Sequence, residues 1–285
     1  MKWRGRRSST HVEDRRGDAG GGMRLPTSGR KPGGLMLIVL VIVAIYFGAD
    51  PSQLLQDTTP PASRPATSAS GDDTLAQFVG VVLADTEDTW HSLLDGGDTP
   101  YREPTLVLFS DQVRSACGMA GAAMGPFYCP ADQRVYIDLG FYRDLQSRFG
   151  APGDFAQAYV IAHEVGHHVQ NLLGISSAVH GRQQLADKVL ANQLSVRLEL
   201  QADCFAGIWA NHAERSRDLL DAGDIDEALV AASAIGDDRL QQQAQGRVVP
   251  ESFTHGSSAQ RMHWFRAGYA SGEIAACDTF AITRP

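Results

Sequence analysis

A His-Glu-x-x-His stretch, from His163 to His167, carries the clearest chemistry in this sequence. In a helix the two histidines lie four residues apart on one face, so two imidazoles can bind one Zn²⁺. Coordination positions then remain for a third protein ligand and a water. Glu164, beside the first histidine, is placed to take a proton from that water. The motif predicts hydrolysis by metal-activated water, with Glu164 as general base.

The residues around the motif predict the helix that it needs. Asp154 can cap the start of a helix, and no proline or glycine stands between Gly153 and the motif. Gly174 suits the position just after the last helical turn. The alternative is a pair of solvated histidines on an ordinary amphipathic helix, which this context disfavours.

A third zinc ligand is expected downstream, because two histidines alone do not usually hold catalytic zinc. Extension of the motif to a third histidine is excluded, since Gln170 and Leu173 occupy the positions that would be glycine and histidine. Glu199 and Asp203 lie four residues apart on a predicted helix over residues 182–214. We expect Glu199 to bind zinc and Asp203 to accept a hydrogen bond from a ligand histidine. The alternative is a solvated acidic edge.

Four longer segments resemble a bacterial family of neutral zinc metallopeptidases, and more broadly the gluzincin metallopeptidases. They are residues 125–130, 162–170, 199–207 and 253–261, and the similarity spans roughly residues 73–278. The resemblance implies a zinc-dependent hydrolase whose predicted ligand positions match the family pattern.

The last of these segments contains two candidates for binding the oxyanion, His255 and Arg261. A zinc hydrolase needs a donor for the negative charge that develops on the attacked carbonyl oxygen. The resemblance makes both residues candidates for this role. A loop histidine, followed by an arginine that pairs with a carboxylate, is an equally open interpretation.

Hydrophobic periodicity predicts a helix over residues 73–94 and strands at residues 105–109 and 134–139. Short helices are expected over residues 225–234 and 237–245. The expected fold class is α+β, mostly helical: a gluzincin-like zinc metallopeptidase domain with a small β-sheet preceding the active-site helix. An edge strand of that sheet could pair with an extended peptide.

The N-terminal part has a different composition. Residues 1–32 contain nine Lys or Arg and three acids, which predicts a basic, disordered, cytoplasmic tail. Residues 33–49 are apolar and predict a transmembrane signal anchor. A cleaved signal peptide is the alternative, although Phe47 spoils the small-residue cleavage pattern. Residues 50–72 form a Pro/Ser/Thr linker, and residues 73–285 form the zinc metallopeptidase domain. The expected location is a single-pass membrane protein with its domain periplasmic or extracellular.

Charge and cysteine content agree with an exported domain. The chain carries a formal charge of −8, and the basic tail contributes positive charge, so the remainder is strongly acidic and no nucleic acid partner is expected. Four cysteines in an oxidising compartment predict two disulfides. Of the three possible connectivities we favour Cys117–Cys129, which closes a short loop, and Cys204–Cys277. The alternative is four reduced thiols.

The predicted function is that of a membrane-anchored zinc peptidase acting on peptide or protein substrates. One alternative is a non-catalytic, zinc-stabilised binding module at the membrane surface, which a fourth protein ligand would favour. Another is a zinc amidase acting on cell-wall peptides, which shares the same metal chemistry and differs in its substrate.

Overall fold

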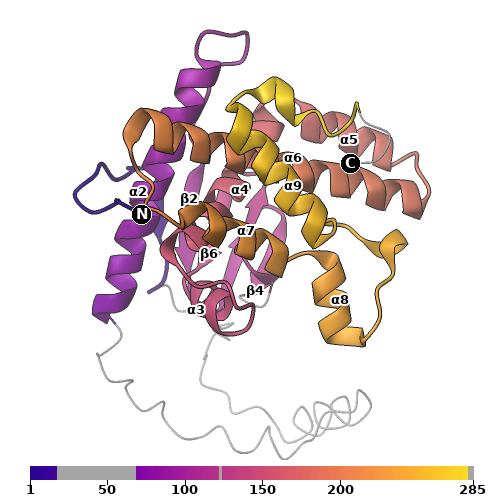
Figure 1. Ribbon diagram of the computed structural model, residues 1–285, viewed down its shortest axis with the longest axis horizontal. Helices are drawn as coiled ribbons and strands as arrows, with labels where there is room; N and C mark the ends of the chain where they lie inside the picture. The colour runs from indigo at the N-terminus through magenta and orange to yellow at the C-terminus, as the bar shows by residue number, and fades with distance from the viewer. Residues whose placement is uncertain (18–68, 122–123, 282–285) are drawn as a thin grey trace, which may run out of the picture. The chain divides into compact units, whose positions relative to one another are not determined.

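A four-stranded sheet and several helices surround the helix that carries the motif, α4 (Asp154–Leu172) (Figure 1). The computed structural model describes residues 1–17, 69–121 and 124–281. The strand order is β1-β2-β6-β5, and the strands are β1 (Val12–Asp14), β2 (Thr105–Phe109), β6 (Arg134–Asp138) and β5 (Phe127–Cys129). β1, β2 and β6 run parallel, and β5 is antiparallel to β6. The α+β class expected from the sequence is confirmed.

The central strands are buried on both faces through their apolar residues, 106–109 of β2 and 135–137 of β6. Alternate residues of β2 and β6 face the main core, among them Leu106 and Val135, which are direct partners across the sheet. The opposite face packs in a smaller cluster that contains Val107 and Cys129. A separate hairpin, β3 (Gln112–Ser115) with β4 (Gly118–Gly121), contributes two buried side chains to that cluster.

The other helices are α2 (Ala69–Leu94), α3 (Gly140–Ser147), α5 (Ile175–Gln183), α6 (Lys188–Arg217), α7 (Asp224–Ala234), α8 (Asp237–Gln245) and α9 (Ser258–Ser271), with short 3₁₀ turns η3 (Pro250–Ser252) and η4 (Ile274–Cys277). The structure contains every predicted helix, α8 with the predicted bounds and the others with shifted ends, and it adds α3, α5 and α9. The predicted helix over residues 182–214 is wrong at its start, because residues 182 and 183 still belong to α5. Asp187 caps α6 by accepting a hydrogen bond from the Leu190 amide at 2.8 Å.

The start of α4 also differs from the prediction. Gly153 is the capping position, and Asp154 is the first helical residue rather than the cap. The free amide of Phe155 instead donates to the carboxylate of Glu227 on α7, at 3.0 Å. A side chain far along the sequence therefore replaces the local cap that the sequence pattern predicted.

Glycines let α6 approach both α4 and α9 closely. A Cβ on Gly166, inside the motif, would lie 3.0 Å from the carbonyl oxygen of Ala202 on α6. A Cβ on Gly268 of α9 would lie only 1.9 Å from the carbonyl oxygen of Cys204. The backbones of α4, α6 and α9 are thus held almost in contact.

The structure contains two disulfides. Cys204 is bonded to Cys277, and Cys117 is bonded to Cys129, so both predicted disulfides are confirmed.

Residues 1–17 do not form a disordered tail, so that prediction is wrong for this segment. β1 extends the sheet beside β2, and the side chain of Trp3 is buried against Phe78 of α2 with ring centroids 5.4 Å apart. We call residues 1–17 the N-terminal arm. The arm belongs to the same compact unit as the motif helix.

Several basic residues of the arm are paired with acids of the same unit. Arg7 contacts Glu87 and Asp88 on α2, and Lys2 contacts Asp218 at the end of α6. Pairing β1 with β2 requires both strands on one side of a membrane. The topology expected from the sequence, with residues 1–32 cytoplasmic and the domain outside, is therefore incompatible with this strand pairing.

The predicted anchor over residues 33–49 and the linker over residues 50–72 lie almost wholly outside the described residues, only residues 69–72 being inside α2. Within the described ranges, no helix combines the length and apolarity that crossing a bilayer requires.

Replacement of Trp3 by alanine tests whether the arm is part of the fold. Because Trp3 is 6% exposed, Trp3→Ala is expected to lower the free energy of unfolding by about 3 kcal/mol. Urea unfolding of the full chain measures the change. Thr10→Ala, at an exposed position of the same arm, is the control and should leave the midpoint unchanged. Equal midpoints for wild type and Trp3→Ala would show that the arm does not pack.

Candidate functional site

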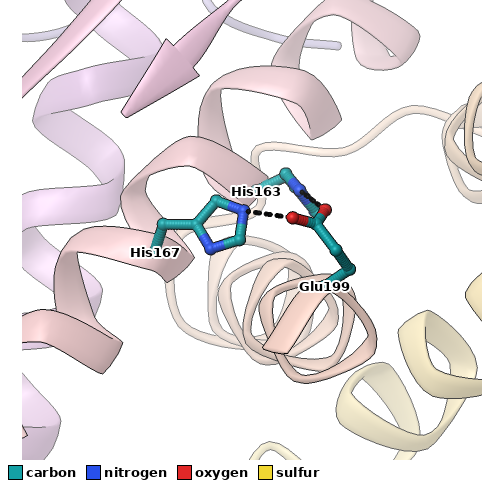
Figure 2. Close-up of side chains that lie close together, drawn as sticks. All are labelled: His163, His167 and Glu199. Carbon is teal, nitrogen blue, oxygen red and sulfur yellow. Dashed lines mark hydrogen bonds and ion pairs between the residues drawn. The ribbon is translucent and has the colours of Figure 1, made fainter. Parts of the chain in front are cut away.

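Three predicted zinc ligands lie together where α4 meets α6. His163 and His167 project from successive turns of α4, and Glu199 reaches them from α6 (Figure 2). His163 Nε2 lies 3.2 Å from one Glu199 carboxylate oxygen, and His167 Nε2 lies 3.5 Å from the other. Their ligand atoms all lie within 4.8 Å of one another. The structure therefore brings Glu199 of α6 beside His163 and His167 of α4, as the sequence predicted.

The geometry fits a tetrahedral zinc site. Zn–N and Zn–O bonds of about 2.05 Å place adjacent ligand atoms about 3.3 Å apart at a tetrahedral centre. The two histidine-to-glutamate distances, 3.2 and 3.5 Å, lie on either side of this value. Within the described residues this metal-ligand group has three members, which leaves a coordination position for a water or substrate.

The other ring nitrogen of each histidine is held by a buried side chain. His163 Nδ1 lies 2.9 Å from Asp203, as predicted. His167 Nδ1 lies 2.9 Å from the side-chain oxygen of Gln170, a partner that the sequence interpretation missed. The Gln170 amide nitrogen in turn donates to the Leu198 carbonyl and to Gln201. These contacts direct both Nε2 atoms toward the shared metal position. A polar residue three positions after a ligand histidine was the available signal.

Asp203 is fully buried and has three partners. Arg261 of α9 donates to it from Nε and one Nη at 2.8 and 2.9 Å, and the Tyr159 hydroxyl donates at 2.5 Å. Burial raises the pKa of Asp203, but Arg261 and His163 outweigh that effect and lower it. Arg261 is 2% exposed, with its other amino group near the Ile235 carbonyl. Arg261 therefore positions Asp203, and its described donor contacts are to protein acceptors.

His255 lines the cleft beside the ligands, on the loop before α9. Its Nδ1 contacts Asp237 at 3.3 Å and the Thr254 hydroxyl at 3.0 Å, which leaves Nε2 as the nitrogen able to face a substrate. The hydrogen bond with Asp237 raises the pKa of His255. Asp237 is itself fixed by the backbone amides of residues 254–256.

Two other groups are set apart from this centre. His168 turns away from the ligands, and its ring nitrogens contact the Tyr128 hydroxyl and the Arg102 carbonyl. A second acidic group, Asp154, Asp224 and Glu227, lies around the Met1 amino group, which is 2.9 Å from Asp154. The N-terminal ammonium group of Met1 thus supplies a positive charge beside these acids.

Comparison with known proteins places the chain in a defined family. Residues 1–280 match the family described as "Putative neutral zinc metallopeptidase". The chain is 53% identical over 289 residues to "Uncharacterized protein YpfJ" of Escherichia coli K12, covering 98% of this chain and 99% of the relative. It is 48% identical over 202 residues to "Uncharacterized protein Rv2575" of Mycobacterium tuberculosis H37Rv, covering 67% and 66%. No solved structure matches the chain.

Zinc binding is expected to release protons. Burial lowers the pKa of His163, but Asp203 and Glu199 outweigh that effect and raise it to about 9, so metal-free His163 is protonated at neutral pH. Since zinc needs the neutral imidazole, binding at pH 7 should displace about one proton from this histidine, and affinity should rise with pH toward 9. Calorimetry in buffers of different ionisation enthalpy measures the proton count. Asp203→Asn should reduce it, and a pH-independent affinity between 6 and 9 would contradict the assignment.

Proposed function

This chain belongs to the neutral zinc metallopeptidase family, and we propose that it hydrolyses peptide bonds with Glu164 as general base. One observation carries the proposal: Glu164 lines the same cleft as all three ligands, on the same helix as both histidines. A carboxylate one residue from a ligand is within reach of a water that the centre activates. The gluzincin resemblance of the ligand pattern supports the same mechanism.

Zn²⁺, held by His163, His167 and Glu199, would supply a Lewis acid that polarises the scissile carbonyl and acidifies a water. Glu164 then accepts a proton at its carboxylate from the attacking water and returns that proton to the leaving amine nitrogen. His255 donates from Nε2 to the carbonyl oxygen as negative charge develops there. Arg261 fixes Asp203, which orients His163.

The substrate backbone is proposed to lie along β5, an edge strand of the sheet. Phe127 and Tyr128 of this strand line the cleft, and β5 packs directly against α4. Backbone hydrogen bonding to an edge strand holds an extended peptide independently of its sequence. This arrangement would carry a scissile carbonyl past the ligand group.

Two other functions use the same site. Within the described part of the chain the ligand group has three members, which disfavours a non-catalytic, zinc-stabilised binding module, because such a module needs a closed coordination shell. A zinc amidase would use the same ligands on cell-wall peptides. Cleavage of muropeptides without cleavage of ordinary peptides would select the amidase.

We also propose that the domain works in an oxidising compartment, in the periplasm or outside the cell. The two disulfides support this location, because such bonds are rare in reducing cytosol. A single-pass span through residues 33–49 would put the N-terminal arm and the domain on opposite sides of a membrane, so this proposal does not include such a span. The N-terminal arm would share the compartment of the domain.

Glu164→Gln tests the mechanism. The variant is expected to bind zinc within a few-fold of wild type while losing about 10²- to 10⁴-fold in kcat, because the amide cannot accept the proton. Metal analysis and a quenched-fluorescence peptide library give the two readouts. Glu251→Gln, an exposed position outside the cleft, is the matched control. Full peptidase activity in Glu164→Gln would reject Glu164 as the base.

The pH profile tests His255. Because the hydrogen bond with Asp237 raises the pKa of His255, the donor form persists to higher pH than in an unpaired histidine, and activity should fall as pH rises through that raised pKa. Asp237→Asn should move this decline to lower pH and reduce kcat by about 10²-fold. Asp238→Asn makes the same charge change one residue away, where the carboxylate bonds Ser258 instead. Identical pH profiles of activity for the two variants would show that His255 takes no part in the reaction.

A further inference from the structure

The cleft extends along one face of α4 and has a volume of about 690 Å³. Four successive turns of the helix line it, through Val160, His163, His167 and Gln170. The ligands therefore occupy the middle of the cleft, with one turn of helix on either side of them. The two ends are built by different parts of the chain and differ in chemistry.

The end near Val160 is apolar. The chain leaves α3, passes through Phe149 and enters α4 at Asp154, which places Phe149 at this end of the helix. Phe141 of α3 packs against Phe149 with ring centroids 6.2 Å apart, and both line the cleft. The backbone at Gly125 lies on the Phe141 ring, since a Cβ there would be 3.5 Å from it. Met124, next to this glycine, lines the same end and is 68% exposed.

The opposite end is polar. α5 follows α4 after a single turn, and the cleft residues at this end are Ser176, His180 and Gln183 from α5 with Ser195 from α6. The wall facing α4 carries His255, with Ile235 and Leu240 on the segments next to Asp237. A substrate lying along the cleft thus meets apolar surface on one side of the metal ligands and hydrogen-bonding groups on the other.

The apolar end carries little net charge. Among the described residues, the ionised side chains at this end are Asp144 and Arg148, which pair at 3.5 Å on the exposed rim. The Arg148 guanidinium also lies 5.6 Å from the centre of the Phe149 ring, so it covers the aromatic wall. A charged substrate group would lose water here without gaining an unpaired partner, whereas a neutral apolar group would gain from burial.

We propose that Met124, Phe141, Phe149 and Val160 form a subsite for one large apolar side chain next to the scissile bond. This inference rests on the proposed peptidase function. Val160 lies one turn before His163, a rise of about 5 Å along the helix. Successive residues of an extended peptide rise about 3.3 Å, so the residue adjoining a carbonyl at the metal reaches this wall. Methionine is unbranched and has three rotatable side-chain bonds, so Met124 suits a subsite that accepts both aromatic and long aliphatic side chains.

Cleavage profiling of the zinc-loaded full chain tests the subsite. Peptides differ only in the residues flanking one scissile bond, with Ala, Leu, Phe, Lys or Glu at each position. Phe and Leu on one side of the bond should exceed Ala by at least about 30-fold in kcat/KM, with Lys and Glu below Ala. Equal rates for Phe, Ala and Glu, from a wild type that does cleave, would overturn the subsite and leave the peptidase function standing.

Variants assign the preference to these residues. Phe141→Ala should reduce the Phe-to-Ala ratio by about 10-fold, and Phe149→Ala serves the same purpose if the first variant fails to fold. Val230→Ala removes a partly exposed apolar side chain on α7, outside the cleft, and should leave the ratio unchanged. An unchanged ratio in both folded phenylalanine variants would overturn the assignment.

A binding measurement separates this inference from the catalytic proposal. Zinc-loaded Glu164→Gln is titrated with the same peptides by calorimetry, so no cleavage is needed. Tighter binding of Phe than Ala peptides, lost in the Glu164→Gln/Phe141→Ala double variant, would support the subsite even if wild type cleaved none of the peptides. That combination would reject the peptidase function alone. Equal binding of all peptides would reject the subsite.

Discussion

The buried carboxylate of Asp203 is the group on which the arrangement of this site depends. It is fully enclosed, and an unpaired charge there would cost several kcal/mol. Its partners come from two other helices: Tyr159 and His163 from α4, and Arg261 from α9. Satisfying Asp203 therefore requires α4, α6 and α9 to meet in one relative position, and that position also brings Glu199 to both histidines. The ion network consequently fixes the helices and orients one zinc ligand at the same time.

Local sequence patterns were sufficient to predict the parts of the site that repeat along a helix. The i and i+4 spacings of His163 with His167, and of Glu199 with Asp203, follow from helix geometry and need no tertiary information. Arg261 and Glu227 could not be assigned in this way, because each meets its partner only after distant helices pack. For Gln170 the signal was local, a buried amide three residues after a ligand, but glutamine is common on helices and its burial was not visible in the sequence.

The N-terminal arm shows why amino-acid composition alone gave a wrong prediction of disorder for residues 1–17. Nine basic residues and few apolar ones in residues 1–32 indicate a chain that cannot build its own core. The arm does not need one, since it contributes Trp3 to an existing core and β1 to an existing sheet edge. Its charges are balanced by acids on α2 and at the end of α6. The low apolar content of the arm therefore indicates that the arm needs the domain in order to fold. The family match to residues 1–280 includes the arm.

The two walls of the cleft are each restrained beside a disulfide. Cys129 belongs to β5, which lines one wall, and Cys204 follows Asp203 directly on the other. Close backbone contacts at Gly166 and Gly268 add to this restraint, because no side chain separates the helices there. The ligand spacings are near those of a tetrahedral site, so metal binding is consistent with this arrangement of the helices. The zinc ligands are thus held by packed helices, whereas the exposed rim carries Met124, whose unbranched side chain can fit substrates of different shape.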